Sequence, residues 1–209
     1  MKRLTDSVRR QITGVVLAGG RGSRFAGKDK GLIDMLGRPL IEHVLATLTP
    51  QVGRVMINAN RNTDVYGRQG CQIIPDRHEG YQGPLAGMAS GLHFAASEYV
   101  VFVPCDSPLI GDDLVARLHD ACVDSSSQVA IPHVGNRTHP VFALIDRSLA
   151  GSLEKFLADG ERKIDRWMSR HRMITVDFSD APERFSNINT EADLAAAERV
   201  LMSDADTGS

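Results

Sequence analysis

The sequence has 209 residues, of which 42% are hydrophobic, and it carries 24 Lys and Arg against 26 Asp and Glu. A chain of this length and composition can bury one substantial core, so we expect a single soluble globular domain. The near-neutral charge disfavours a nucleic-acid binder that works through a broad basic face. No apolar run approaches the roughly 20 residues that span a bilayer, which disfavours a membrane protein.

Two further features favour a cytoplasmic location. The charged opening, MKRLTDSVRR, is not followed by the apolar stretch of a secretory signal. Cys71, Cys105 and Cys122 are scattered, odd in number and without metal-ligand spacing, as is typical of reduced thiols.

Strand and helix patterns alternate along the chain. Residues 12–17 are a short β-branched run that stops at a pair of glycines, as a buried parallel strand does, and residues 99–106 give the strongest strand signal. Thr190 and Asp193 have the spacing of a capping box before the closing helix. In chain order we expect a strand at 12–17, a helix beginning at Pro39, strands at 54–58 and 71–75, a helix at 84–96, a strand at 99–106, a helix at 112–124, strands at 128–132 and 141–145, a helix at 147–158, a strand at 173–178 and a helix at 190–202.

This alternation predicts an α/β fold with a doubly wound, Rossmann-like and mostly parallel sheet flanked by helices. We expect one domain at 12–202, an N-terminal extension at 1–11 and a disordered tail at 203–209. Such sheets bind ligands outside the carboxyl ends of their strands, so we look there for chemistry.

A glycine-rich loop follows the first strand, where a phosphate cradle belongs. Its glycines allow backbone N–H groups to approach a ligand closely. Four cations and one anion leave the loop with a local charge of +3, which suits a triphosphate. The cations are Arg21, Arg24, Lys28 and Lys30, and the anion is Asp29.

The loop fails two familiar phosphate-binding patterns. Residues 22–28 fit G-x-x-x-x-G-K, but Asp29 stands where a P-loop needs Ser or Thr to hold Mg²⁺. Gly31 and Gly37 disfavour a helix beginning at the lysine. In the dinucleotide pattern G-x-G-x-x-G, Phe25 takes the place of the last glycine. We therefore reject both interpretations.

The loop nevertheless resembles a known family. The stretch LAGGRGSRFAGKDKG, residues 17–31, is similar to the loop of pyrophosphate-releasing nucleotidylyltransferases, and most similar to that of the molybdenum cofactor guanylyltransferase (MobA) family. Further motifs of that family recur in order and together cover about residues 12–200. They are INANR at 57–61, GPLAGM at 83–88, PCDSPLI at 104–110, HPVFAL at 139–144 and NINTEADL at 187–194.

The resemblance implies a reaction and its participants. GMP would pass from GTP to the terminal phosphate of molybdopterin, or of Mo-molybdopterin, with release of pyrophosphate and formation of the guanine dinucleotide cofactor. Mg²⁺ would be the cofactor. The partners would be GTP, the pterin and other proteins of molybdenum cofactor biosynthesis and delivery, with no nucleic acid and no membrane.

The resemblance also implies roles for particular residues. Arg24, Lys30 and Asp106 would be catalytic, and Asp106, at the end of the strongest strand, would hold Mg²⁺. Asn187 and Asn189 would complete the phosphate or metal site. His139, which the resemblance does not assign, is a candidate for contact with the acceptor. The residues that bind GTP would be Leu17, Ala18, Gly19, Lys30, Asn58, Asp76 and Asp106.

Structural roles compete with several of these assignments. On the residues alone, Asp106 is equally suited to a turn or cap before Pro108, and His139 before Pro140 to a turn. Asn187 and Asn189 can serve as the turn and cap before the closing helix. Asp76 can likewise form a turn and Asn58 a strand-end hydrogen bond.

The acceptor site is less legible in the sequence. Arg137 and Arg162–Lys163 are further candidates for contact with the pterin phosphate or dithiolene. Trp167 favours helix packing over a pterin contact. Cys105 is more typical of a small buried residue than of a nucleophile, and the reaction needs no covalent step.

Other functions remain open at this stage. A molybdopterin cytidylyltransferase, or an enzyme acting on a sugar or polyol phosphate, would use the same mechanism. A non-catalytic nucleotide-binding or cofactor-delivery module could keep the fold but would not need Asp106 and Lys30. A GTPase is disfavoured because no N-K-x-D segment is present.

Overall fold

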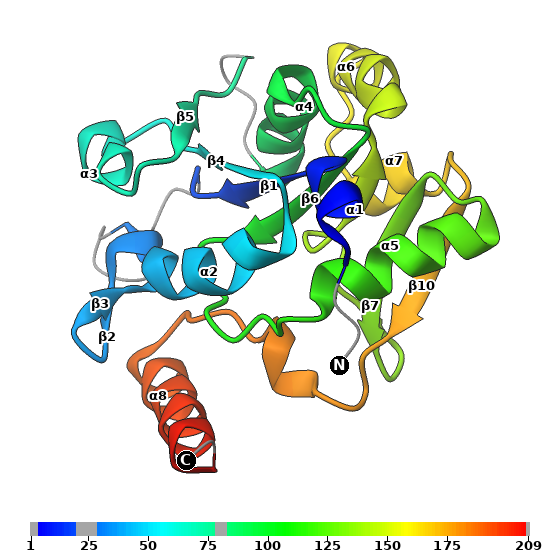
Figure 1. Ribbon diagram of the computed structural model, residues 1–209. Coiled ribbons are helices and arrows are strands. Elements are labelled where there is room, and N and C mark those ends of the chain that lie inside the picture. The colour runs from blue at the N-terminus through cyan, green and yellow to red at the C-terminus, as the bar shows by residue number, and fades with distance from the viewer. Residues whose placement is uncertain (1–3, 20–28, 78–82, 208–209) are drawn as a thin grey trace.

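A computed structural model describes residues 4–19, 29–77 and 83–207, and it confirms the predicted α/β architecture. The central sheet has the strand order β10-β7-β9-β6-β1-β4-β5, with β8 paired to β7 (Figure 1). Its strands are β1 (Ile12–Leu17), β4 (Arg54–Asn58), β5 (Gln72–Ile74), β6 (Tyr99–Pro104), β7 (Val129–Val134), β8 (Arg137–Thr138), β9 (Leu144–Asp146) and β10 (Met173–Asp177).

Helices cover both faces of this sheet. In Figure 1, α4 and α6 lie above it and α2 and α5 below it. The helices are α1 (Asp6–Arg10), α2 (Leu40–Leu48), α3 (Thr63–Gly67), α4 (Pro84–Phe94), α5 (Leu114–Ser125), α6 (Ala150–Ala158), α7 (Ile164–Met168) and α8 (Glu191–Thr207). Single 3-10 turns occur at Lys30–Leu32, Thr49–Gln51, Arg147–Leu149 and Pro182–Phe185. None of the described helices is long and apolar enough to cross a membrane.

The strand β1 lies at the centre because its side chains are buried on both faces. Val16 and Ile12 point into the cluster formed with α2 and α5, whereas Val15 belongs to the cluster formed with α4 and α6. In β6, Val101 and Phe102 divide between the same two clusters. These continuous apolar runs are what a parallel strand covered on both sides requires.

The order of the strands creates a topological switch point. From β1 the chain builds β4 and β5 on one side and then crosses to place β6 on the other, with β1 parallel to both β4 and β6. Ligands of open α/β sheets bind at the carboxyl ends of the strands where the winding reverses. Here those ends are Leu17 of β1 and Pro104 of β6, which pair in register.

A third apolar cluster joins the C-terminal segment to the start of the chain. A small antiparallel hairpin, β2 (Asp34–Met35) and β3 (Arg38–Pro39), follows the Lys30 turn. Met35 and Ile33 of this region pack against Ile188 and Ala197, before and within α8. The hairpin thereby holds the segment that contains Asn187 and Asn189 close to the turn that begins at Lys30.

The structure departs from the sequence-based expectations at several elements. The strand expected at 141–145 is β9, three residues later, and it runs antiparallel to both β6 and β7. The hairpin, α1, α3 and α7 were not expected, and α8 continues to Thr207 instead of ending at Met202. The capping box is confirmed, because the Thr190 hydroxyl and the Asp193 carboxylate each accept from the other's backbone N–H, at 3.1 and 2.8 Å.

Helix α4 approaches the sheet through glycines. A Cβ atom added to Gly91 would lie 2.5 Å from Cε1 of the fully buried Phe102 and 3.1 Å from Val15. Since β6 carries this phenylalanine on its buried face, only glycine at this helix position allows close contact.

We expect Gly91→Ala to lower the free energy of unfolding by about 1–3 kcal/mol, because overpacking outweighs the better helix propensity of alanine. Urea denaturation measures the change. Gly151→Ala in α6 is the matched control, since a Cβ there meets nothing within 4 Å; it should be neutral or stabilise by up to about 1 kcal/mol. Equal effects of the two substitutions would contradict the packing argument.

Candidate active site

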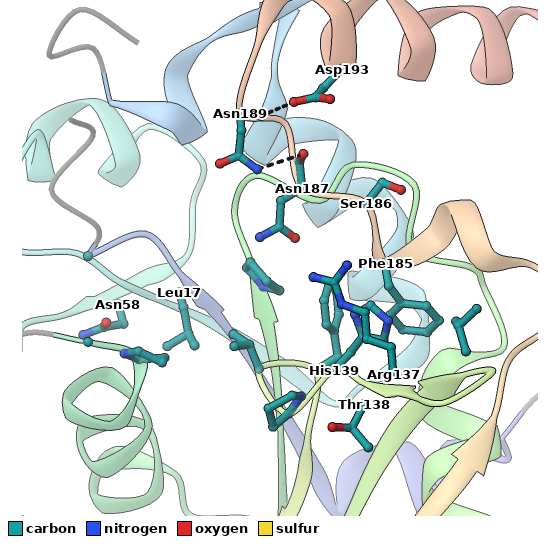
Figure 2. A pocket seen from close by; sticks show the side chains of 18 of the residues that line it. Leu17, Asn58, Arg137, Thr138, His139, Phe185, Ser186, Asn187, Asn189 and Asp193 are labelled. Carbon is teal, nitrogen blue, oxygen red and sulfur yellow. Dashed lines mark hydrogen bonds between the residues drawn. The ribbon is translucent and has the colours of Figure 1, made fainter. Parts of the chain in front are cut away.

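A large cavity lies at the carboxyl ends of β1, β4 and β6. Its volume is about 1250 Å³, and Figure 2 shows Leu17 and Asn58 at one end and Arg137, His139 and Phe185 at the other. Asn187 and Asn189 lie between these ends in the view. The residues that line it are Leu17, Gly19, Asn58, Asn60, Arg61, Asp76, Gly83, Pro84, Pro104, Val134, Arg137, Thr138, His139, Pro140, Val141, Phe142, Pro182, Phe185, Ser186, Asn187, Asn189 and Asp193.

Three segments distant in sequence meet beside this cavity. The ammonium of Lys30 donates to Asp106 Oδ2 at 2.8 Å and to Asn189 Oδ1 at 2.6 Å. The Asp106 side chain is only 10% exposed and that of Lys30 only 23%. A carboxylate so far out of water is stable when it is paired and hydrogen-bonded, as it is here.

The segment before α8 is held against the end of β6 by its backbone as well. The N–H of Ile188 donates to the carbonyl of Asp106 at 2.8 Å, and the hydroxyl of Ser107 donates to Asn187 Oδ1 at 2.9 Å. Asp193 accepts from the backbone N–H of Asn189 at 2.9 Å. Asn189 is therefore fixed with its amide oxygen on Lys30. Its backbone belongs to the turn before α8, while its side chain contacts the site.

Asp29 has a structural role that the loop patterns did not predict. One of its carboxylate oxygens accepts from the Tyr66 hydroxyl at 2.5 Å, and the other accepts from Asn62 Nδ2 at 2.9 Å. The first oxygen also accepts from the N–H of Gly31 at 3.3 Å and so caps the 3-10 turn that begins at Lys30. The residue that replaces the P-loop Ser or Thr thus anchors the backbone that carries Lys30.

Asn58 and Asp76 form a polar pair at the other side of β1. Asn58 is 2% exposed, and its amide donates to Asp76 Oδ1 at 2.9 Å and to the carbonyl of Ile74 at 3.2 Å. Asn60 donates to Asp76 Oδ2 at 2.8 Å, and its own amide oxygen accepts from the Asp76 N–H at 2.8 Å. The Ala18 N–H donates to the carbonyl of Asn58 at 2.8 Å, which ties the loop after β1 to this pair.

Close approach of glycine makes this arrangement possible. A Cβ atom at Gly87 would lie 2.3 Å from Asn58 Oδ1, and one at Gly19 would lie 3.4 Å from the same atom. The GPLAG motif therefore supplies, in α4, the space that the Asn58 amide occupies.

The opposite end of the cavity is aromatic. The imidazole of His139 lies over the ring of Phe185, with centroids 4.9 Å apart and planes inclined by 30°. Phe142 meets Phe185 edge-on at 5.0 Å. Burial lowers the pKa of His139, and the nearby Arg137 lowers it further, which favours the neutral imidazole. This end can hold a flat heterocycle beside a cation.

Most of the predicted site residues meet at this cavity. Leu17, Gly19, Asn58, Asp76, His139, Asn187 and Asn189 line it. Ala18 and Lys30 are hydrogen-bonded to residues that line it, and Asp106 is bonded to Lys30 just behind the lining. Arg24 lies outside the described residues. Asn60, Phe185 and the pair Asp29–Tyr66 were not predicted to belong to the site, although the INANR motif includes Asn60.

Two of the alternatives for the acceptor are not at this cavity. The Arg162 guanidinium donates to backbone carbonyls of Leu157 and Glu161, and neither Arg162 nor Lys163 lines the cavity. Trp167 is fully buried beneath α6, where its indole N–H donates to Ser152 at 3.3 Å. The helix-packing interpretation of Trp167 is confirmed.

Cys105 is a packing residue. It is 7% exposed, and burial raises the pKa of its thiol, with the neighbouring Asp106 adding to the effect. Such a thiol is not ionised at neutral pH and is a poor nucleophile.

The residues around Asp106 fit Mg²⁺ bound together with a nucleotide. Within the described part of the chain no three His, Cys, Asp or Glu side chains converge as a metal cluster. Mg²⁺ in nucleotide sites uses one or two carboxylates, and phosphates and water complete its shell. Asp106 could supply one such carboxylate. The Lys30 ammonium is bonded to its Oδ2 atom, which leaves the Oδ1 atom for an ion.

Comparisons with known proteins agree with this geometry. A family model described as a MobA-like NTP transferase domain matches residues 14–174. A molybdenum cofactor guanylyltransferase of Shewanella pealeana is 43% identical over 180 residues, which are 86% of this chain and 90% of that relative. One of Photobacterium profundum is 44% identical over 184 residues, 88% of this chain and 94% of the relative.

Solved structures show the same fold. Molybdopterin-guanine dinucleotide biosynthesis protein A of Archaeoglobus fulgidus superposes with a TM-score of 0.77 at 26% identity, over 91% of this chain and 99% of that one. A 4-diphosphocytidyl-2C-methyl-D-erythritolsynthase of Anaerococcus prevotii shares the fold at 13% identity and a TM-score of 0.72, over 95% and 100% of the two chains.

The fold, the cavity and the matching family model together define a nucleotidyltransferase. Within that class, the chain belongs to the MobA-like family of NTP transferases, and the molybdenum cofactor guanylyltransferases of Shewanella pealeana and Photobacterium profundum are 43% and 44% identical to it.

The anchor at Asp29 makes a prediction about pH. Burial, together with Cys105 and Asp29, raises the pKa of the fully buried Tyr66 far above its ordinary value near 10. The folded state therefore holds this proton more tightly than the unfolded state. The stability that results is complete below pH 10 and is lost as the pH rises above it.

Between pH 10 and 11 we expect the free energy of unfolding to fall by about 1 kcal/mol more in the wild type than in Tyr66→Phe. Urea denaturation over pH 8–11 measures both slopes. Because the other titrating groups are common to both proteins, equal slopes would mean that the phenol of Tyr66 is not protected by the fold.

Proposed function

We propose that this protein transfers GMP from GTP to the terminal phosphate of molybdopterin, with release of pyrophosphate and formation of a guanine dinucleotide cofactor. The observation that carries the proposal is the meeting of Lys30, Asp106 and Asn189 at the switch point of the sheet, in a chain of this family. The protein would act in the cytoplasm and exchange the pterin with other proteins of cofactor biosynthesis and delivery.

The nucleoside of GTP would bind at the end of the cavity formed by Leu17, Ala18, Gly19, Asn58 and Asp76. A carboxylate can accept from both N1–H and N2–H of guanine, and cytosine does not offer this pair of donors. Asp76 lines the cavity beside β5 and is the one carboxylate at this end, among the described residues that line it. We therefore assign base recognition to Asp76, with Asn58 supporting it.

The triphosphate would lie across Lys30 toward Asp106. An anionic nucleophile attacking a triphosphate faces chiefly electrostatic repulsion, so positioning and charge compensation supply most of the catalysis. Lys30 and Arg24 would neutralise the phosphates. Asp106 would hold Mg²⁺, which when bound stabilises negative charge on the α-phosphate and the leaving pyrophosphate.

The acceptor would enter from the aromatic end. His139 would contact the pterin or its phosphate, and Asn187 and Asn189 would orient the phosphate groups near Lys30. A phosphate monoester is already ionised at neutral pH, so attack on the α-phosphorus needs no general base. Pyrophosphate leaves as the new phosphoanhydride bond forms, and the neutral imidazole of His139 adds no charge to oppose or assist it.

The decisive assay is product analysis with purified protein, Mg²⁺, molybdopterin and either GTP or CTP. We expect pyrophosphate from GTP only when the pterin is present, loss of activity with EDTA and recovery with excess Mg²⁺. A preference for CTP would assign the sister cytidylyltransferase activity. Orthophosphate released without acceptor would identify a hydrolase and contradict the proposal.

Lys30→Ala should lower kcat/KM for transfer by about 10²–10³-fold, because it removes the cation that meets the phosphates and leaves Asp106 unpaired. Lys155→Ala, an exposed lysine of α6, is the matched control and should retain wild-type activity. Lys30→Arg should recover part of the loss. Near-wild-type turnover of Lys30→Ala would remove this lysine from the mechanism.

A further inference from the structure

Asp76 is held by two amides, one on each carboxylate oxygen. Asn58 donates to Oδ1 at 2.9 Å and Asn60 donates to Oδ2 at 2.8 Å. Rotation of the carboxylate would break at least one of these bonds. Its plane is therefore fixed before any ligand arrives.

Asn60 makes a second hydrogen bond to Asp76. The amide oxygen of Asn60 accepts from the backbone N–H of Asp76 at 2.8 Å, so side chain and backbone of the aspartate are gripped together. Planar two-bond contacts of this kind fix orientation better than single hydrogen bonds do. Asn60 therefore fixes both the backbone position of Asp76 and the direction of its carboxylate.

The sheet does not need this contact to keep its register. β4 pairs with β5 through Met56, Ile57 and Asn58, and the N–H of Ala59 donates to the carbonyl of Ile74 at 3.1 Å beyond the last pair. Asn60 is exposed and lines the cavity, outside the apolar core. The hydrogen bonds of Asn60 to Asp76 therefore orient one carboxylate of the cavity.

A carboxylate has about four acceptor positions, and two amide donors leave one on each oxygen. We propose that Asn60 is a positioning residue for base selection, which keeps these two acceptors parallel for the N1–H and N2–H donors of guanine. This inference rests on the proposed function, because it takes Asp76 as the group that binds the base.

The test compares GTP with ITP, which lacks the 2-amino group and so makes one hydrogen bond fewer to a carboxylate. The full-length protein is used, and dissociation constants for both nucleotides with Mg²⁺ are measured by equilibrium dialysis. Transfer rates to molybdopterin are measured in parallel. The wild type should bind GTP about 10–100-fold more tightly than ITP, as expected for one hydrogen bond to a charged group.

Asn60→Ala should reduce that preference at least fivefold while changing ITP affinity by less than about threefold. Asn60→Asp is nearly isosteric and keeps the acceptor for the Asp76 N–H, but it replaces the donor to Oδ2, so it should lose the preference as well. Gln72→Ala is the matched control on the same pair of strands. Gln72 is exposed and bonds Arg54, away from the cavity, and its variant should keep the wild-type ratio.

The outcomes separate the inference from the proposed function. Asn60 variants that keep the wild-type GTP/ITP ratio, or that lose affinity for both nucleotides equally, would overturn the positioning role. A wild type that does not distinguish GTP from ITP would overturn it together with base recognition by Asp76. A wild type that prefers GTP but transfers no GMP would overturn only the proposed reaction.

Discussion

The ion pair between Lys30 and Asp106 is the constraint on which the architecture of the site depends. Its partners are separated by 76 residues, and Asn189, which shares the ammonium, lies 159 residues after Lys30. A different structural element positions each group. The buried strand β6 positions Asp106, the turn that Asp29 caps positions Lys30, and the apolar cluster beneath α8 positions Asn189. A charge pair buried to this degree is tolerated only when all three elements keep their positions, so that both charges stay paired and hydrogen-bonded.

The fold was predictable where the sequence pattern reports burial directly. The runs in β1 and β6 are apolar on both faces, and the turns that follow them contain glycine or the sequence Asp-Ser-Pro, so strand and site position could be inferred together. The direction of β9 was not predictable, because an antiparallel strand of three residues inside a parallel sheet has no local pattern that distinguishes it. Its pairing with β6 and β7 is decided by the sheet as a whole.

The candidate site shows the same division between local and long-range information. Asp106 could be singled out because parallel strands bring their carboxyl ends to one edge, whereas the roles of Asn58 and Asp76 were implied by the family resemblance. The partners of Asp29 could not, since Tyr66 lies 37 residues away in a helix of five residues with no distinctive pattern. In the sequence, Asp29 is a mismatch to the P-loop pattern. In the structure, its hydrogen bonds fix the turn that carries Lys30.

The two ends of the cavity differ in how they can recognise a ligand. At the end near β4, each carboxylate oxygen of Asp76 already accepts one amide hydrogen bond, and Gly87 leaves the room that the Asn58 amide occupies, so this end is preorganised for one hydrogen-bond pattern. At the aromatic end, His139 and Phe185 offer ring faces, which accept any flat heterocycle of suitable size. In the proposed reaction, discrimination between nucleotides would therefore come from the first end, where a base without matching donors leaves an acceptor of Asp76 unpaired. The acceptor substrate would be selected more by shape and by its phosphate, which would have to reach Lys30 in the proposed reaction.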